Sequence, residues 1–365
     1  MKWDMVKFSD VIRIQNGRDH KRVNNPNGKY PIIGSGGIMG YADEYLCEGN
    51  CTIIGRKGSI NNPLFLKQKF WNVDTAFALV PGDLVHPKYF YYFCLTYNFE
   101  KHNKATTLPS LTKTDLAEIT FPLPPLPIQK RIAEILDAAD ALRKKDQELL
   151  KKYDELAQAI FIDMFGDPVK NEKGWEVKKL GDVFNVASGG TPATTNPDYW
   201  TDGYIPWIGS NMCKDSIIRE TDGKYITEDG LNNSSARIFA KGTVIVALVG
   251  ATIGKVGLIE LDCSTNQNVA GLQILPKSEV NSIFSFYMMK NLYYKFDELG
   301  GDKFKMANLS FVRGLPFWLP PLKLQEKFKA KISLLTNQRD FLLVYQNLKL
   351  FESLLQKAFS GDLVS

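Results

Sequence analysis

Two glycine-rich stretches could cradle a phosphate, and they are the first candidates for chemistry in this sequence of 365 residues. The stretch from Gly34 to Gly40, GSGGIMG, departs from the G-x-G-x-x-G spacing of dinucleotide-binding loops and lacks the distal acidic partner. The stretch from Gly250 to Val256, GATIGKV, is one residue short of a phosphate-binding loop and ends on Val instead of a Mg²⁺-binding Ser or Thr. We interpret the first as a turn or backbone-exposing loop and the second as a hairpin.

Carboxylates and nucleophiles give little further support for catalysis. Glu176 and Lys178 have the E-x-K form of a metal-dependent nuclease, with Asp163 and Asp167 upstream, so a nuclease stays open as one hypothesis. The three histidines are scattered and form no acid–base or nucleophilic constellation. We therefore expect no catalytic residue in this chain.

The five cysteines are an odd number in a long chain, which favours reduced thiols over a disulfide framework. Cys47 and Cys51 have ligand-like spacing, but no second Cys or His pair accompanies them, so we expect no metal site. No apolar run reaches the roughly 20 residues that span a bilayer, and the N-terminus lacks the apolar core of a signal peptide. These features predict a cytoplasmic protein without membrane contact.

The charge distribution does not by itself indicate nucleic-acid binding. The net charge is +5 overall, with +4 in residues 1–124, −1 in 125–165, −1 in 166–318 and +3 in 319–365. A nucleic-acid-binding domain commonly shows a strongly basic stripe, and this chain has none. Evidence for DNA binding must therefore come from other features.

Two similar stretches predict the elements that position the rest of the chain. Each opens on Pro-Pro-Leu, at Pro124 and Pro320, carries a Gln four residues after the second Pro, and stops at Gly-Asp after about forty residues. Prolines at the start and glycine at the end are typical of a helix. The sequence therefore predicts two long helices at equivalent places.

What precedes each helix is also repeated, with Pro-Ile-Ile-Gly-Ser at Pro31 matching Pro-Trp-Ile-Gly-Ser at Pro206. Short β-prone runs alternate with Gly, Asn, Asp and Pro in both copies, and an aromatic run follows them, at 86–102 and 281–299. We interpret the aromatic runs as helices that pack into the core rather than as base-stacking surfaces.

The expected fold is α+β, with two β-rich domains that contain some helices, separated by two long antiparallel helices that form a coiled coil. The internal duplication gives it an approximate two-fold axis. The predicted parts are a first domain at 1–124, a first helix at 125–165, a second domain at 166–318 and a second helix at 319–365. Apolar residues at steps of three and four predict the seam of the coiled coil: Ile132, Ile135, Ala139, Leu142, Leu149, Tyr153, Leu156, Ile160, Phe328, Ile332, Leu335 and Leu342.

The chain resembles the DNA-specificity subunit of Type I restriction-modification systems. The resemblance rests on the duplication, on the L-P-P-L-x-x-x-Q opening of each helix, and on the start of the second domain. That start reads S-G-G-T-P from Ser188, N-P-D-Y-W from Asn196 and I-P-W-I from Ile205. The first domain lacks the S-G-G-T-P opening, and Ile128 and Leu324 precede the two Gln residues where the family often has Glu.

The resemblance implies a non-catalytic reader of DNA. Each globular part is then a target-recognition domain for one half of a split sequence in double-stranded DNA, and the helices set the gap between the halves. The family's chains also dock two methyltransferase subunits and two restriction subunits, so the complex is an adenine DNA methyltransferase and an ATP-dependent endonuclease. The cofactors S-adenosylmethionine, ATP and Mg²⁺ are expected on those partners and not on this chain.

Polar loop residues are the candidate DNA contacts under this interpretation, because Arg pairs with guanine and Asn with adenine in the major groove. In the first domain they are Arg18, His20, Lys21, Arg22, Ser35, Arg56, Lys57, Ser59, Lys104, Thr106, Thr107 and Ser110. In the second domain they are Ser188, Thr191, Thr194, Thr195, Ser210, Asn211, Lys255, Lys303, Lys305 and Asn308.

The main alternative is a coiled-coil scaffold that presents two β-rich protein-binding domains. It predicts binding that does not respond to salt or to DNA sequence. The half-site sequences and the spacer length do not follow from the sequence, because base preference depends on loop geometry and DNA shape.

Overall fold

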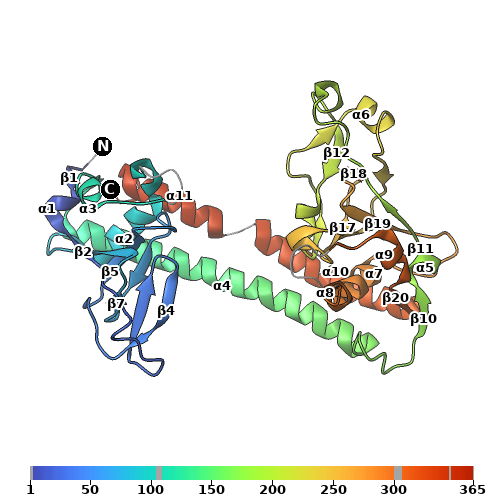
Figure 1. Cartoon of the computed structure of the whole chain (residues 1–365), viewed down its shortest axis with the longest axis horizontal. Coiled ribbons are helices and arrows are strands. Elements are labelled where there is room, and N and C mark those ends of the chain that lie inside the picture. The colour runs from blue at the N-terminus through green and yellow to red at the C-terminus, as the bar shows by residue number, and fades with distance from the viewer. Residues whose placement is uncertain (1–2, 104–108, 300–305, 345–346, 365) are drawn as a thin grey trace. The chain divides into compact units, whose positions relative to one another are not determined.

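The computed structural model describes residues 3–103, 109–299, 306–344 and 347–364 (Figure 1). The described residues fall into two compact units, the first from the ranges 1–149 and 342–365 and the second from the range 150–341. The chain thus passes from unit 1 to unit 2 and back to unit 1. None of the described helices is long and apolar enough to cross a membrane.

Unit 1 is built on a four-stranded sheet of order β2-β8-β5-β6 and a three-stranded sheet of order β4-β3-β7, with a separate two-stranded ribbon of β1 and β9. Its strands are β1 (Met5–Lys7), β2 (Ile12–Asn16), β3 (Tyr30–Gly34), β4 (Gly37–Ala42), β5 (Cys51–Gly55), β6 (Leu64–Leu66), β7 (Trp71–Asn72), β8 (Ala76–Pro81) and β9 (Thr120–Pro122). Its helices are α1 (Phe8–Val11), α2 (Pro87–Thr96), η1 (Phe99–His102), α3 (Lys113–Ala117), the first part of α4 (Leu126–Phe165) and α11 (Asn347–Ser360).

The core of unit 1 lies between the four-stranded sheet and the aromatic helix α2. Every residue of β5 is buried, which explains why CTIIG reads as a continuous apolar run instead of an alternating one. In α2, Tyr89, Phe90 and Phe93 are buried, and the rings of Phe90 and Phe93 contact Phe121 of β9, with centroid distances of 5.3 and 5.4 Å. The prediction that this aromatic run is a core helix is therefore confirmed.

Unit 2 repeats this plan with a five-stranded sheet of order β11-β19-β16-β17-β13, a four-stranded sheet of order β14-β12-β18-β15 and a ribbon of β10 and β20. Its strands are β10 (Glu176–Lys179), β11 (Phe184–Ser188), β12 (Ile205–Ile208), β13 (Ser216–Ile218), β14 (Tyr225–Ile226), β15 (Ile238–Phe239), β16 (Val244–Ala247), β17 (Val256–Ile259), β18 (Cys263–Thr265), β19 (Val269–Ile274) and β20 (Pro316–Leu319). Its helices are the last part of α4, α5 (Leu180–Val183), η2 (Pro197–Tyr199), η3 (Ser210–Met212), α6 (Glu228–Asn232), η4 (Gly250–Thr252), α7 (Ser282–Asn291), α8 (Tyr293–Asp297), α9 (Leu309–Gly314) and most of α10 (Leu322–Val344).

Strand pairing confirms the repeat that the sequence indicated. In unit 1, β3 runs parallel to β7 with Ile32 opposite Trp71, and in unit 2, β12 runs parallel to β18 with Trp207 opposite Ser264. Each glycine-rich stretch contains a turn: the first connects β3 to β4 and runs on into β4, and the second connects β16 to β17. Both interpretations made from the sequence are therefore confirmed.

The helices α4, α10 and α11 lie within the two ranges that the sequence predicts to be helical, 125–165 and 319–365. After α4, Gly166 has a φ of 88°, and after α11, Gly361 has a φ of 92°, a left-handed conformation that glycine adopts at helix ends without steric cost. The second stretch contains two helices, α10 and α11, on either side of residues 345–346, which lie outside the described part of the chain. The sequence predicted one helix over 319–365, and the structure describes two helices, α10 and α11, within this range.

The two ends of α4 bury different residues, because each end joins the core of its own unit. In unit 1, Ile132, Leu136 and Ala139 share a core with Phe351 and Leu355 of α11.

In unit 2, Ala157, Phe161 and Phe165 share a core with Phe328 and Ile332 of α10. There α4 and α10 run antiparallel, since Phe161 meets Phe328 edge to face at 5.7 Å and the Tyr153 hydroxyl donates to Gln338 at 3.5 Å.

The predicted seam is only partly buried. Ile132, Ala139, Phe328 and Ile332 are buried, and Ile135, Tyr153, Ile160, Leu335 and Leu342 are half-buried. Three seam leucines stay exposed, at 47% for Leu142, 39% for Leu149 and 47% for Leu156. The heptad spacing did not predict that the aromatic residues near the end of α4 point into the core of unit 2.

Candidate nucleic-acid interface

In unit 1, loops that are far apart in the sequence meet beyond the end of β5. The Arg56 amide donates to the Thr75 carbonyl at 2.8 Å, and the Arg56 carbonyl accepts from the Leu111 amide at 2.9 Å. Next to it, Lys57 and Ser110 form an isolated antiparallel bridge. These bonds hold the loop after β5 against the loop before β8 and the segment before α3.

The loop after β2 joins the same edge. The Arg18 amide donates to the Asn72 carbonyl at 2.8 Å, and the Trp71 indole N–H donates to the Arg18 carbonyl at 3.2 Å. The chain passes so closely here that a Cβ on Gly17 would lie 1.8 Å from the Val73 carbonyl oxygen, so only glycine fits.

We name this surface loop edge 1. Its members are polar residues of unit 1 that are exposed or half-buried: Arg18, Ser35, Arg56, Lys57, Ser59 and Ser110. Ser35 belongs to it because the Ser35 Cβ would lie 3.1 Å from a Cβ on Gly55 at the end of β5. The structure thus brings together six of the residues that the sequence proposed as DNA contacts.

Unit 2 repeats the backbone hydrogen bond of this arrangement, although its indole donor lies on β12, the counterpart of β3, and not on the counterpart of β7. The Gly190 amide donates to the Thr265 carbonyl at 2.8 Å, and the Trp207 indole N–H donates to the Gly190 carbonyl at 3.1 Å. A Cβ on Gly189 would lie 2.1 Å from the Thr265 carbonyl oxygen. Gly189 therefore does in unit 2 what Gly17 does in unit 1.

The other side of this edge is also repeated. The Leu248 amide donates to the Asn268 carbonyl at 2.8 Å, and the Leu248 carbonyl accepts from the Ala307 amide at 2.8 Å. Val249 and Met306 form the isolated bridge that corresponds to Lys57 and Ser110 in unit 1. We name the surface formed by Thr191, Ser210, Val249 and Met306, beside the buried Gly190, loop edge 2.

The remaining candidates of the first domain flank loop edge 1. His20 is half-buried, and Lys21 and Arg22 are exposed, in the turn that follows Arg18. The Lys21 amide donates to the Asp19 carboxylate at 3.1 Å, which lowers the pKa of Asp19. Three candidates lie outside the described residues, namely Lys104, Thr106 and Thr107.

In the second domain, Thr191 and Ser210 belong to loop edge 2, and Ser188 is half-buried at the end of β11. Thr194 and Thr195 are exposed in the loop that follows. Lys303 and Lys305 lie outside the described residues.

Three candidates of the second domain make contacts within the protein. The Lys255 ammonium lies 2.8 Å from Asp215 and 4.5 Å from the centre of the Tyr293 ring. The Asn308 carboxamide oxygen accepts from the Phe311 amide and so caps α9. The Asn211 side chain donates to Asp222 at 3.2 Å.

The sequence reasoning missed apolar residues at these edges. Ile38 and Met39, in the strand after the Ser35 turn, are 62% and 60% exposed, and Met306 is 72% exposed. In unit 2, a hollow of about 300 Å³ beside Thr191 is lined by Trp200, Trp207, Thr194 and Lys224. The sequence offered one signal for these residues, namely apolar side chains within loops that are otherwise rich in glycine and polar residues.

The residues proposed for metal or nuclease chemistry do not assemble. Burial raises the pKa of Cys47 to about 11 and that of Cys51 to about 12, which disfavours the thiolate that zinc requires. Glu176 and Lys178 form an exposed ion pair at 3.3 Å. Within the described ranges, no three His, Cys, Asp or Glu side chains are placed to hold a metal ion.

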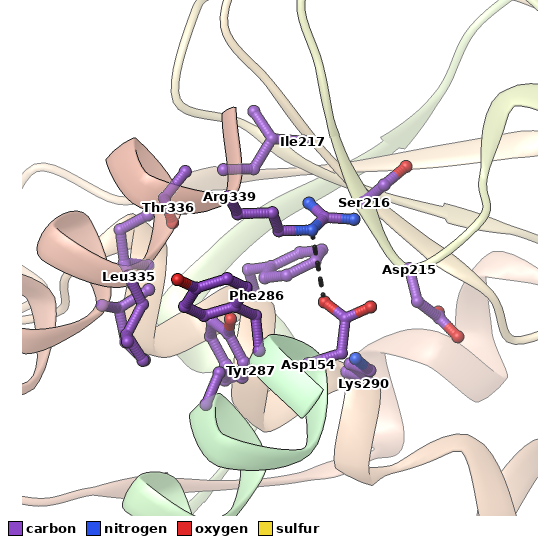
Figure 2. Close-up of a pocket in the computed structure, with 14 residues that line it drawn as sticks. Asp154, Asp215, Ser216, Ile217, Phe286, Tyr287, Lys290, Leu335, Thr336 and Arg339 are labelled. Carbon is purple, nitrogen blue, oxygen red and sulfur yellow. Dashed lines mark ion pairs between the residues drawn. The ribbon is translucent and has the colours of Figure 1, made fainter. Parts of the chain in front are cut away.

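A small cavity lies where α4 and α10 meet the second domain (Figure 2). Arg339 points toward Asp154, with a distance of 3.6 Å between the Arg339 Nε and a carboxylate oxygen. The cavity measures about 30 Å³, which is the space of roughly one water molecule. It therefore has no room for a nucleotide or for S-adenosylmethionine.

The chain matches known proteins over nearly its whole length. The profile of the Type I restriction modification DNA specificity domain matches residues 1–152 and again residues 172–342. The MjaIX specificity subunit of the Type I restriction enzyme of Methanocaldococcus jannaschii is 26% identical, over 99% of this chain and 93% of that protein. The MjaVIII specificity subunit of the same organism is 24% identical, over 80% of this chain and 76% of that protein.

A solved structure shares the fold. The crystal structure of the S subunit of a Type I restriction-modification system from M. genitalium has a TM-score of 0.64 at 18% identity and covers 98% of this chain and 96% of its own. The two domain matches cover most of the sequence and coincide with the duplicated strand pairing and loop edges. The chain therefore belongs to the family of Type I restriction-modification DNA specificity subunits.

Proposed function

We propose that loop edge 1 and loop edge 2 each bind one half of a split target in double-stranded DNA. The observation that carries the proposal is the repeated edge: the same backbone hydrogen bonds present side chains at equivalent positions in both units. Exposed Arg and Lys at loop edge 1 suit phosphates and guanine, and hydroxyls at both edges suit base edges and phosphates. Each reader of a split site then needs only a short stretch of DNA.

We further propose that the long helices set the spacer between the two halves. The start of α4 is built into the core of unit 1 and its end into the core of unit 2. A helix fastened at both ends is a stiff connection, because 3.6 residues per turn fix the rotation and rise along it. A change in the length of α4 is therefore expected to change the spacer.

The chemistry belongs to partner subunits in this proposal. Two methyltransferase subunits bring S-adenosylmethionine and methylate an adenine in each half-site, and two restriction subunits bring ATP and Mg²⁺. Leu142 and Leu149 are seven residues apart on α4 and exposed, which supports a docking role for this helix face. This chain supplies recognition and assembly and no catalytic group.

The test is to exchange residues 1–124 for the recognition domain of another specificity subunit and to sequence the methylated genome. The expected result is a methylated motif in which one half changes while the other half and the spacer stay the same. An unchanged motif contradicts the proposal. A salt-insensitive complex without DNA would instead favour a protein-binding scaffold, and Mg²⁺-dependent cleavage by the isolated chain would favour a nuclease.

A further inference from the structure

Arg56 and Leu248 occupy the same backbone position in the two loop edges. In both units the amide of this residue donates to the carbonyl of the residue just before the neighbouring strand of the sheet, β8 or β19. Its carbonyl accepts from the amide of a residue shortly before α3 or α9. The following residue forms the isolated bridge, with Lys57 paired to Ser110 and Val249 paired to Met306. Arg56 and Leu248 are therefore equivalent by their backbone hydrogen bonds.

The side chains at these positions differ in kind. Arg56 is exposed, and its guanidinium is held by the Asp74 carbonyl at 3.4 Å and by the Phe77 ring at 5.8 Å. Its counterpart in unit 2, Leu248, is apolar and buried, so unit 2 offers no cation at this position.

The bridge next to this position differs in the same sense. Lys57 is an exposed cation and Ser110 a half-buried hydroxyl, whereas Val249 is half-buried and Met306 is 72% exposed. Among the described residues, Met306 is the most exposed large apolar side chain. Loop edge 2 therefore offers apolar side chains, Val249 and Met306, where loop edge 1 offers a cation and a hydroxyl.

We propose that this difference sets the base preference of each domain, given that both loop edges bind DNA as proposed above. Arg56 makes a guanine necessary in the half-site of the first domain. Val249 and Met306 make a thymine necessary in the half-site of the second domain, by packing against its methyl group.

The chemistry of the major groove supports both assignments. Guanine presents O6 and N7 as neighbouring acceptors, and the planar guanidinium of Arg meets both at once. The C5 methyl of thymine is the apolar group that a base pair offers in this groove. Met is flexible and polarisable, so its side chain can adjust to pack against the methyl group of the base.

For the first domain, the experiment measures binding of the complex with its methyltransferase subunits to duplexes carrying each base at each position of the half-site. Arg56→Ala is expected to lower affinity for the cognate duplex by roughly 5- to 150-fold and to abolish the preference at one guanine. Replacing that guanine with 7-deazaguanine removes N7. This should weaken DNA binding by the unsubstituted protein but not by the variant. Lys29→Ala is the control, because Lys29 is exposed beside β3 at the end of the hairpin opposite Ser35.

Two outcomes overturn the assignment of Arg56. If Arg56→Ala weakens all duplexes equally and lowers the salt slope by about one, Arg56 contacts a phosphate instead. If the variant behaves like Lys29→Ala, the guanidinium does not contact DNA. Because Arg56 is exposed, its removal leaves the core intact, and circular dichroism of the variant checks this.

For the second domain, each thymine of the half-site is replaced in turn by deoxyuridine, which removes only the methyl group. One replacement is expected to weaken binding by about fourfold, the effect of roughly one buried carbon, and Met306→Ala should remove this penalty. Equal binding of thymine and deoxyuridine at every position overturns the proposal. A penalty that Met306→Ala leaves unchanged overturns it as well.

The outcome also separates this inference from the proposed function. A complex that methylates no split motif contradicts the proposed function itself. A split motif whose two halves ignore Arg56 and Met306 contradicts only the assignment of base preferences.

Discussion

Gln129 and Gln325 hold the same place in the two units and make the same three hydrogen bonds. Each Oε1 accepts from the amide of the residue that caps the aromatic helix, His86 at 2.7 Å and Asn281 at 2.9 Å. Each Nε2 donates to the carbonyl of the first proline of the Pro-Pro pair and to a carbonyl two residues before the cap. One buried amide thus fastens the long helix to the domain that precedes it.

Replacement of either glutamine by Ala is expected to destabilise its own unit. Both side chains are fully buried, so truncation leaves backbone groups without partners, at a cost of about 2 kcal/mol or more. Denaturant unfolding should show the loss in one transition for Gln129→Ala and in the other for Gln325→Ala. The exposed Gln147→Ala is the control, and equal stability of all three variants would contradict the anchoring role.

The cap of α2 should make unit 1 sensitive to acid. Desolvation lowers the pKa of His86 below its ordinary 6.5, and its Nδ1 accepts from the Tyr89 amide at 3.4 Å. The unfolded chain therefore binds a proton more readily, so stability is full above about pH 6.5 and falls as the pH drops below it.

His86→Asn tests this, because Asn281 already caps the equivalent helix of unit 2. The variant should keep its melting temperature between about pH 7 and 5, while the unsubstituted protein loses stability over the same range. A pH dependence that the substitution does not reduce would show that another group is responsible.

The close chain crossings should tolerate only glycine. A Cβ at Gly17 would lie 1.8 Å from the Val73 carbonyl oxygen, and a Cβ at Gly189 would lie 2.1 Å from the Thr265 carbonyl oxygen. The Val73 amide donates to the Ile33 carbonyl of β3, and Thr265 pairs with Ile208 of β12, so this backbone cannot move without losing backbone pairing. Gly17→Ala and Gly189→Ala should each weaken DNA binding and lower the melting temperature. Gly36→Ala, where a Cβ meets no atom within 4 Å, should behave like the unsubstituted protein.

Helix α4 should not tolerate a proline in its middle. Leu142→Pro removes a backbone hydrogen bond and clashes with the preceding turn, at a cost of about 3 kcal/mol or more. Circular dichroism should show lost helix, and gel filtration should show no assembly with the methyltransferase subunit. Leu142→Ala retains the backbone, so a similar loss in that variant would point to the side chain and not to the helix.

The sequence predicted the repeated elements well because their signals are local. Prolines, a terminal glycine and a Gln at fixed spacing mark each helix start and end, and the match between Pro31 and Pro206 is confirmed by strand register. Even where the first domain lacks the S-G-G-T-P opening, the structure shows that Gly17 corresponds to Gly189.

The assembled loop edges could not be predicted, since they depend on bonds between distant segments. Nothing near Arg56 indicates that its carbonyl bonds to Leu111, or that Arg18 bonds to Asn72. Polar type alone also gave no indication that Lys255 forms an ion pair or that Asn308 caps a helix. The exposed Met306 carried no polar signal.

The return of the chain to unit 1 has a consequence for its biosynthesis. Phe351 and Phe359 of α11 pack on Tyr92, Tyr89 and Phe93 of α2, so the first core is complete only after α11 has left the ribosome. The second unit, from residue 150 to 341, is synthesised without interruption and can finish folding earlier. Until α11 is synthesised, part of the aromatic core of the first unit stays uncovered, so a chain that stops between unit 2 and α11 is expected to leave the first unit unstable.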